Sequence, residues 1–403
     1  MRRLKVLTAA YLAVWSLLIG GATAAYLDLV NWVIDFFWKD LPQALGIATA
    51  WRPLVICLPL SLVIGYTQAH WGAYPKTIAE ILTAVRQGKG SDYHHWWQIL
   101  LAALLIMGAG ASVGPEASAS GLVAGMIYWL NCRYKLIRAQ EAQLAPAGLA
   151  QQLRGIWLTR TATAKLDQPL AAVVPSARRR KSAYLLLSLV GVVGLVIFFH
   201  FFPQEGVFGF HRPAIHWQWG GLLVVIPALV VGWLFGAFFV KLGLLSERLV
   251  DSHRHHYLRA LLGGVMMAAA AAFTTDLLFS GEFRIIDFAS ESLTLAPLPL
   301  LAIAILKAVV TNLGFSLGWR GGTIFPAIFS ALAAGACLAH FLPWMPRLTV
   351  TIVMTTALTV ILEKPLVTAI LLWLLLPVQF SPIILAVAYL TSAVIKRVPA
   401  LKP

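Results

Sequence analysis

Long apolar segments are the feature that most constrains the fold of this chain. A helix needs about 20 apolar residues to cross the hydrocarbon core of a bilayer, and several segments reach that length. They run continuously rather than alternating in stretches of about 10 residues, which excludes a β-barrel. The segments fall at residues 6–27, 47–68, 96–109, 117–130, 184–202, 220–242, 258–279, 293–315, 323–341, 348–362, 366–378 and 380–395. We therefore expect an all-α, polytopic membrane protein.

The charged residues favour a membrane location and argue against a nucleic-acid partner. Only 12% of the 403 residues are charged, about half of the share found in soluble domains. The net charge of +15 comes from short basic clusters between apolar segments, a pattern typical of cytoplasmic loops. These clusters lie at residues 2–5, 133–160, 178–181, 248–259 and 396–402. We expect a multi-pass protein of the cell (plasma) membrane, in contact with membrane lipid, with both termini in the cytoplasm.

Two sequence motifs occur in the same order in both parts of the chain. LDQPLAAVV at 166–174 is similar to LEKPLVTAI at 362–370. Upstream of each is a glycine-rich interruption, GAGASVGPEASASGLVAG at 108–125 and GFSLGWRGGTIFPAIFSALAAG at 314–335. Interrupted apolar segments at corresponding positions are typical of transporters with inverted repeats, whose binding site lies near the bilayer midplane.

The repeat divides the chain into two membrane halves. We expect the first half at 1–182 and the second at 183–403. The polar stretch 133–182 is interpreted as a basic cytoplasmic connection at the end of the first half. Broken helices at membrane depth are tolerated only where they are buried in protein or line a cavity, so the interruptions are candidates for a functional site.

Glu116 is the sharpest candidate within the first interruption. An ionisable side chain inside a membrane is costly and indicates function. Because Glu116 follows Gly114 and Pro115, we expect it to open a helix, with its carboxylate beside free backbone N–H groups. A carboxylate there competes with a permeating anion and leaves when it is protonated. The alternative interpretation is a helix-capping glutamate near the interface, where acidic groups are favoured.

The other two interruptions are glycine- and proline-rich. Gly321 and Gly322 allow the backbone to come close to a ligand, and Pro326 falls early in the next helix, as proline prefers. In WGAYPKTIAEI, Gly72 and Pro75 form a turn before a short amphipathic helix. These interruptions therefore join Glu116 as candidate parts of one site.

Several other polar residues have simpler interpretations. We expect Lys307 to have a structural or pairing role rather than to line an anion path, and Arg320 to be an interfacial anchor. The histidines of DSHRHHY are interpreted as part of a polar loop, because no second cluster of metal ligands accompanies them. The sequence carries neither a Walker loop nor a dinucleotide fingerprint. We expect no metal, no cofactor and no enzymatic activity.

The motifs resemble those of the CLC family of chloride channels and chloride/proton antiporters. GAGASVGPEAS is similar to the family's segment around the gating glutamate, with Glu116 at the glutamate and Pro115 in place of an arginine. GWRGGTIFPAIF is similar to its G-G-x-F-x-P segment, and WGAYP to its G-S-G-I-P segment. The resemblance implies an anion site formed by Gly72, Gly114, Thr323, Ile324 and Phe325. Structural residues at the helix breaks would be Pro75, Pro115, Gly321, Gly322 and Pro326.

In the WGAYP segment, Gly72 takes the place of the family's anion-coordinating serine. The resemblance also implies a homodimer with a pore in each subunit. Three departures from the family pattern stand out. The basic run 178–180 stands where antiporters carry an internal proton-relay glutamate. The chain ends at Pro403, about where the family's last helix and its tyrosine would begin. We also expect no cytoplasmic nucleotide-binding domain after the membrane part.

We expect passive or proton-coupled transport of small anions, chloride first, through a pore gated by Glu116. A fluoride/proton antiporter of the same fold is an alternative, because the altered glutamate segment and the absent serine are departures also met in the fluoride-exporting branch. A degenerate, non-transporting membrane subunit is a second alternative. An intramembrane enzyme is the weakest, since Glu116 has no nucleophile or histidine near it in sequence.

Overall fold

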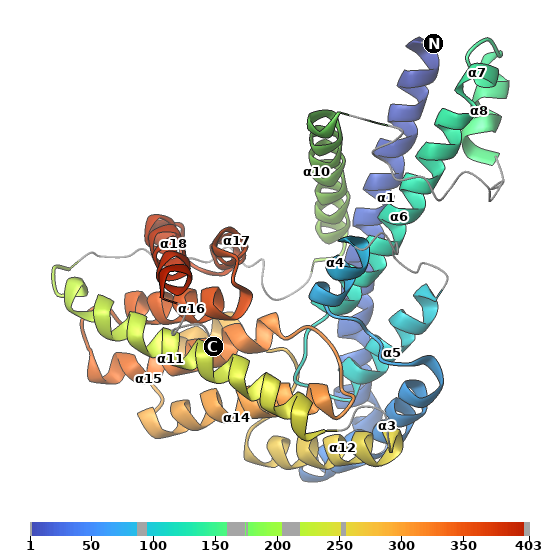
Figure 1. The fold of residues 1–403 in the computed structure, drawn as a ribbon. Helices are drawn as coiled ribbons and strands as arrows, with labels where there is room; N and C mark the ends of the chain where they lie inside the picture. Colours follow the sequence, from blue (N-terminus) through green and yellow to red (C-terminus); the bar gives the residue numbers. More distant parts are fainter. Residues whose placement is uncertain are drawn as a thin grey trace. The chain divides into compact units, whose positions relative to one another are not determined.

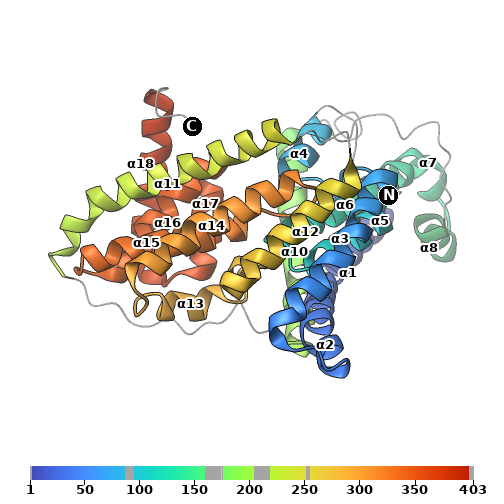
Figure 2. The same ribbon diagram turned by 90° about the horizontal axis from the view of Figure 1, so that it is seen from below.

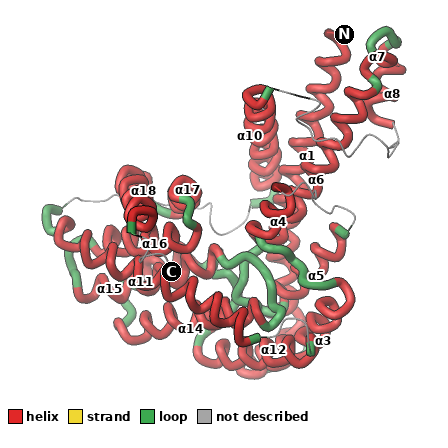
Figure 3. The backbone as a smooth tube through the Cα atoms, in the orientation of Figure 1, coloured by secondary structure: helices red, strands yellow, loops and turns green. Residues whose placement is uncertain are grey.

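The computed structural model describes residues 2–86, 95–158, 174, 176–203, 218–250 and 255–398. Within these ranges the chain consists of helices and loops (Figure 3). The strand-like pairing recorded there is one isolated bridge between Gly114 and Gly322. The expected all-α fold is therefore confirmed.

Each of the apolar segments corresponds to one helix; the arrangement of the helices is shown in Figure 1. The first set is α1 (Arg2–Asp35), α2 (Leu41–Ala44), α3 (Arg52–Trp71), α4 (Ile78–Arg86), α5 (Trp96–Gly108), α6 (Glu116–Ala139), α7 (Glu141–Leu144), α8 (Leu149–Leu158) and α10 (Ala177–Phe201). Two short turns of helix, η1 (Phe36–Asp40) and η2 (Thr49–Trp51), lie between α1 and α3. The expected helix start at Glu116 and the expected short helix after Pro75 are both present.

The second set begins with a 29-residue helix. It comprises α11 (Gly221–Leu249), α12 (His256–Phe273), η4 (Thr275–Leu277), α13 (Ile285–Glu291), α14 (Pro297–Ser316), α15 (Ile324–Phe341), α16 (Pro346–Leu362), α17 (Pro365–Leu375), η5 (Val378–Phe380) and α18 (Ser381–Arg397). Proline occupies the first turn of α14, α16, α17 and α18, where its missing N–H costs nothing. Of the LDQPLAAVV motif, only Val174 lies within the described residues.

In the described part of the chain, eight helices are long and apolar enough to cross a bilayer. They are Arg2–Ala44, Thr49–Trp71, Ala177–Phe201, Gly221–Leu249, His256–Phe273, Pro297–Ser316, Ile324–Phe341 and Val378–Arg397. Three shorter apolar helices, α5, α16 and α17, accompany them. The polytopic architecture expected from the apolar segments is confirmed.

The chain forms two compact units, and the first consists of Met1–Trp32, Lys76–Leu100 and Ala117–Gln204. Its helices α1 and α10 pack backbone to backbone at Gly20 and Gly191. A Cβ on Gly20 would overlap the carbonyl group of Gly191. Small residues at such crossings let membrane helices approach closely.

Arg133 connects the helices of the basic segment in this unit. Its guanidinium is buried, 8% exposed, and donates hydrogen bonds to the carbonyl of Ile156 at 2.7 Å and of Trp157 at 3.1 Å. A third bond reaches the hydroxyl of Tyr11 at 3.2 Å. Arg133 therefore joins α6 to α1 and α8, although the sequence predicts that the basic cluster 133–160 is exposed to solvent.

The second unit consists of Val33–Pro75, Leu101–Glu116 and Glu205–Pro403. In it α16 lies between α11 and α15, and α14 packs on α15 (Figure 2). Every residue of α16 from Leu348 to Val360 is buried. The helix α11 approaches α16 through Gly236, where a Cβ would stand 2.8 Å from the carbonyl oxygen of Ala357. This core holds the N-terminus of α15 in place.

Candidate functional site

The carboxylate of Glu116 lies at the N-terminus of α15. Its Oε1 atom accepts a hydrogen bond of 2.9 Å from the backbone N–H of Phe325, 209 residues away in the chain. The first N–H groups of a helix have no intrahelical partner and carry partial positive charge. Glu116 thus occupies a position where α15 would otherwise present a donor to an anion.

The second oxygen of Glu116 is buried without a partner. Within the described residues, Oε2 has no hydrogen bond. Gly114 and Gly322 stand directly against it, since a Cβ on either glycine would overlap the carboxylate. The glycines of the two interruptions therefore form a cradle around the carboxylate of Glu116. A residue with a side chain at either position would occupy the space of that carboxylate.

The same two glycines connect the interruptions through their backbones. Gly114 N donates to Gly322 O at 2.7 Å, and Gly322 N donates to Gly114 O at 2.8 Å. Both glycines are buried, so this pairing satisfies polar groups that would be costly to leave unmade. The structure thus brings together the two segments that the sequence singled out as related.

The third interruption is joined to this group through Arg320. Its Nε atom donates to the carbonyl of Pro75 at 3.3 Å, and its guanidinium lies 4.5 Å from the ring centroid of Phe315. Gly72 itself is exposed at the end of α3 with a φ angle of +94°. Arg320 therefore connects two interruptions, a role more specific than the interfacial anchor expected.

The remaining predicted residues surround the start of α15. Thr323 is its N-cap, with no side-chain cap bond, and Ile324 and Phe325 are its first two residues. Pro326 is buried in the first turn, and Pro115 is buried immediately before α6. Gly321 packs on the side chain of Val113. These positions stay candidates for anion binding and for shaping the site.

Sequence reasoning missed Glu282, a second buried carboxylate. Glu282 is 6% exposed and interacts electrostatically with Glu116. It follows Gly281 in LLFSGEFRII, between the apolar segments 258–279 and 293–315, so part of the signal that identified Glu116 was present. Unlike Glu116, it has a cation nearby in the sequence, Arg284, but that arginine is directed to Asp276 and Glu291.

Lys307 fixes the loop that carries Glu282. The ammonium group is fully buried and donates to the carbonyls of Asp276 at 2.9 Å, Leu278 at 2.7 Å and Phe279 at 2.7 Å. It also lies 5.2 Å from the ring centroid of Phe329. Three donors on one ammonium satisfy three carbonyls, which agrees with the structural or pairing role expected.

An ion pair joins Arg284, the N-cap residue of α13, to Glu291 at the end of that helix, outside the candidate membrane spans. Arg284 donates to the two carboxylate oxygens of Glu291 at 2.9 and 2.6 Å. This hydrogen bonding raises the pKa of Arg284 and holds the pKa of Glu291 below its ordinary value of 4.5. The ion pair connects the two ends of the segment 284–291, which follows Glu282 in the chain.

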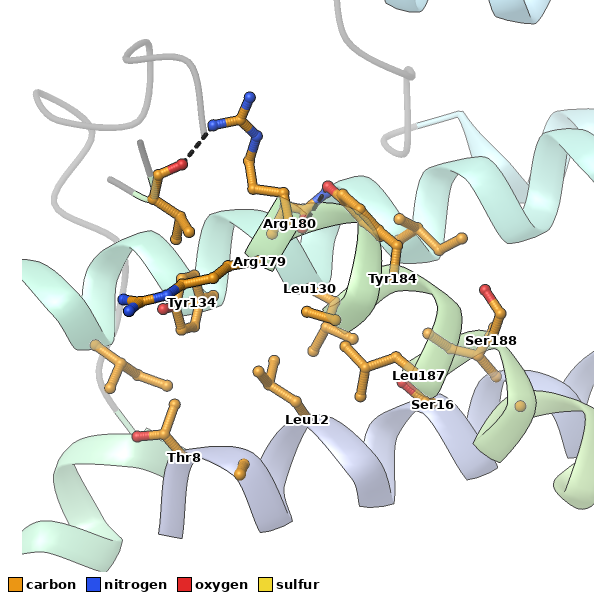
Figure 4. A pocket seen from close by; sticks show the side chains of 18 of the residues that line it. Thr8, Leu12, Ser16, Leu130, Tyr134, Arg179, Arg180, Tyr184, Leu187 and Ser188 are labelled. Carbon is orange, nitrogen blue, oxygen red and sulfur yellow. Dashed lines mark hydrogen bonds between the residues drawn. The ribbon is translucent and has the colours of Figure 1, made fainter. Parts of the chain in front are cut away.

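One large cavity lies within the first unit. It has a volume of about 720 Å³ and is enclosed by α1, α6 and α10 (Figure 4). Leu12, Leu130 and Leu187 line its apolar part, and Arg179 and Arg180 lie at its basic end. Among the described residues there is no cluster of three His, Cys, Asp or Glu residues that could hold a metal ion.

The comparisons with known proteins agree with this fold. Residues 60–397 match the family described as voltage gated chloride channel. The chain therefore belongs to this family of ion channels and transporters. A protein of Escherichia fergusonii named "Putative ion-transport protein YfeO" is 24% identical over 333 residues, 77% of this chain and 73% of that protein. A protein of the same name from Shigella flexneri is 24% identical over 331 residues, 77% and 74% of the two chains.

Two solved structures have the same fold. A slow cyanobacterial Cl⁻/H⁺ antiporter has a TM-score of 0.66 at 17% identity, with 98% of this chain and 95% of that chain covered. A CLC-type fluoride/proton antiporter has a TM-score of 0.60 at 15% identity, with 96% of each chain covered. The protein is accordingly a membrane protein with the fold of CLC anion transporters.

Proposed function

We propose that the protein moves small inorganic anions, chloride first, through a pathway that Glu116 closes. The hydrogen bond between Glu116 Oε1 and Phe325 N is the observation that carries this proposal. A carboxylate and an inorganic anion compete for the same N–H donors and the same partial positive charge. While Glu116 is ionised and bound to Phe325, an anion is excluded from that position.

Protonation of Glu116 opens the pathway in this proposal. A neutral carboxyl group loses its attraction to the N-terminus of α15 and leaves it. The N–H groups of Thr323, Ile324 and Phe325 then bind the anion, which gives up part of its hydration. The cradle of Gly114 and Gly322 leaves no Cβ in this space, so the backbone is accessible to an ion.

Fluoride is the second candidate ion. Gly72 contributes no hydroxyl group near the end of α3, where the family resemblance implies a serine in chloride-coordinating members. The two solved structures, titled as Cl⁻/H⁺ and fluoride/proton antiporters, support coupling of either ion to protons. Comparing the chloride flux with the fluoride flux through the purified protein decides between the two ions.

We further propose that two copies of the chain form a homodimer in the plasma membrane. Each subunit consists of the membrane halves 1–182 and 183–403, and both of its termini lie in the cytoplasm. The basic clusters at residues 2–5 and 396–402 support this orientation, because such clusters favour the cytoplasmic side.

Anion efflux from vesicles containing the purified protein tests the proposal. Chloride and fluoride are compared at two pH values for the wild type, Glu116→Gln and Glu116→Ala. We expect pH-dependent efflux in the wild type and pH-independent efflux in both variants. Glu247→Gln, an acid-to-amide change at an exposed position of α11, is the matched control and should behave as the wild type. Unaltered pH dependence in the Glu116 variants would overturn the assignment of the gate.

A further inference from the structure

Glu282 lies on a loop that runs directly against α15. The preceding residue, Gly281, has a φ angle of +83°, and a Cβ there would stand 2.6 Å from the ring of Phe329. Phe329 is one turn of helix beyond Phe325, the donor to Glu116. The backbone of the Glu282 loop is thus in contact with the helix whose N-terminus binds the gating carboxylate.

The loop is also fixed to the segment that leads to Glu116. Phe279 N donates to the carbonyl of Gly110 at 3.2 Å, and the ring of Phe279 lies 5.3 Å from that of Trp38 in an edge-to-face contact. Trp38 in turn donates to the carbonyl of Gly108 at 2.9 Å. With the three bonds from Lys307, these contacts hold the loop against the first interruption.

Among the described residues, the charged groups around Glu282 leave its carboxylate without a cationic partner. Asp276 and Arg284 are paired with each other, and Arg284 also binds Glu291. Lys307 is directed to backbone carbonyls. In the described part of the chain, no ion pair is recorded for Glu116 or Glu282. Two carboxylates that interact in a buried site avoid being ionised together and share a proton.

We infer that Glu282 is a second proton-binding group of the site, which receives the proton that Glu116 releases when it returns to the N-terminus of α15. The inference rests on the proposed function, since it requires Glu116 to be the gate. In the transfer, the O–H bond of the Glu116 carboxyl group breaks and an O–H bond forms on the Glu282 carboxylate. The proton is the only species exchanged, and the pair carries one negative charge before and after.

The test separates proton movement from anion movement. Vesicles containing the wild type, Glu282→Gln or Glu282→Asp are given a chloride or fluoride gradient, and anion flux and proton flux are recorded together. In Glu282→Gln we expect the proton flux to fall about a hundredfold, the lower end of what a positioned proton-transfer group contributes. Anion flux should persist and keep its dependence on Glu116. Glu282→Asp retains a carboxyl group and should restore proton flux in part.

The outcomes distinguish the two proposals. If Glu116→Ala removes the pH dependence of anion flux and Glu282→Gln keeps the wild-type proton-to-anion ratio, the role of Glu282 is wrong and the gate stands. Anion flux without proton movement in the wild type also overturns the role of Glu282. If Glu116→Ala leaves the pH dependence of anion flux unchanged, the assignment of Glu116 as the gate is wrong, whatever the result for Glu282. Glu247→Gln controls for the loss of an acidic group, and elution as a single species controls for folding.

A second inference concerns the cavity between α1, α6 and α10. Its walls combine leucine side chains with a cluster of basic residues at one end (Figure 4). The charged residues that line the cavity are Lys5, Arg138, Glu141, Arg179 and Arg180. Arg138 is paired with Glu141, so the remaining charge of the lining is positive. An apolar groove with a basic end matches an acyl chain and an anionic headgroup.

We propose that this cavity binds one anionic phospholipid, with the phosphate at Arg179 and the acyl chain along α1 and α10. The test is co-purification from phosphatidylcholine vesicles with or without phosphatidylglycerol, followed by quantification of retained lipid. Arg179→Gln should reduce retained phosphatidylglycerol severalfold. Arg178→Gln changes the neighbouring arginine, which does not line the cavity, and should have no effect. Equal retention by the two variants, or equal retention of both lipids, would contradict the proposal.

Discussion

The backbones of Gly114 and Gly322 are bound to each other by two hydrogen bonds, of 2.7 and 2.8 Å. This pairing aligns the N-terminus of α6 with that of α15, so that the first residue of one helix reaches the first turn of the other. The geometry explains why both interruptions contain glycine at the point of contact. It also yields predictions that depend on the size of a single side chain.

The first prediction concerns Gly322→Ala. The added Cβ would overlap Glu116 Oε2, so the carboxylate must leave its position at Phe325. We expect anion flux at neutral pH to rise toward that of Glu116→Ala, and stability to fall by about 1–3 kcal/mol through overpacking. Vesicle efflux and thermal unfolding in detergent measure the two effects. Gly148→Ala is the control, because a Cβ there has no neighbour within 4 Å.

The second prediction concerns Lys307→Met. The substitution keeps the apolar stem but removes the donor to three carbonyls. Buried acceptors that lose their partner cost about 1–3 kcal/mol each, so we expect a large loss of thermal stability in detergent. Lys241→Met, at an exposed position of α11, should be close to the wild type. Similar unfolding temperatures for the two variants would contradict the structural role of Lys307.

The third prediction is a pH dependence of stability at α13. Arg284 holds the pKa of Glu291 below its ordinary value, so the folded state favours the ionised form. The stabilisation from this pair is complete above the ordinary pKa of glutamate and is lost as the pH falls through the lowered pKa. Glu291→Gln should therefore reduce the unfolding temperature slightly at neutral pH and leave it unchanged in strong acid. A difference that persists in acid would exclude the ion pair as its cause.

The fourth prediction concerns the packing of α11 on α16. A side chain at Gly236 would meet the carbonyl oxygen of Ala357 and the Cβ of Val360, each at 2.8 Å. Gly236→Val should force the helices apart and cost about 1–3 kcal/mol. Leu234→Val, at a 54% exposed position of the same helix, is the control and should change stability little. Unfolding temperatures in detergent compare the two.

The sequence predicted the longer helices well because each of the apolar segments corresponds to one helix of the structure. It also predicted that Glu116 opens a helix, since Gly114 and Pro115 interrupt the segment before it. The contact with Phe325 could be anticipated only through the family resemblance, because no local pattern links residues 209 positions apart. Periodicity and spacing describe local structure and carry no information on such a distance.

Two buried charged residues could not be placed from the sequence, for one physical reason. Arg133 and Glu282 each belong to a segment with other charges nearby, which is also the pattern of a solvated loop. In the structure Arg133 binds carbonyls of α8, and the arginine near Glu282 is used by other acids. Which charges pair is decided by tertiary contacts, and composition alone does not reveal it.

The ammonium group of Lys307 occupies the centre of three carbonyl oxygens, an arrangement in which other proteins place a bound sodium or potassium ion. Here the positive charge is part of α14 and is attached by covalent bonds. It cannot be removed by dialysis, exchanged for another cation or depleted by a chelator. Replacing one alkali-metal salt with another should therefore leave the transport rate unchanged, provided that the anion is kept the same.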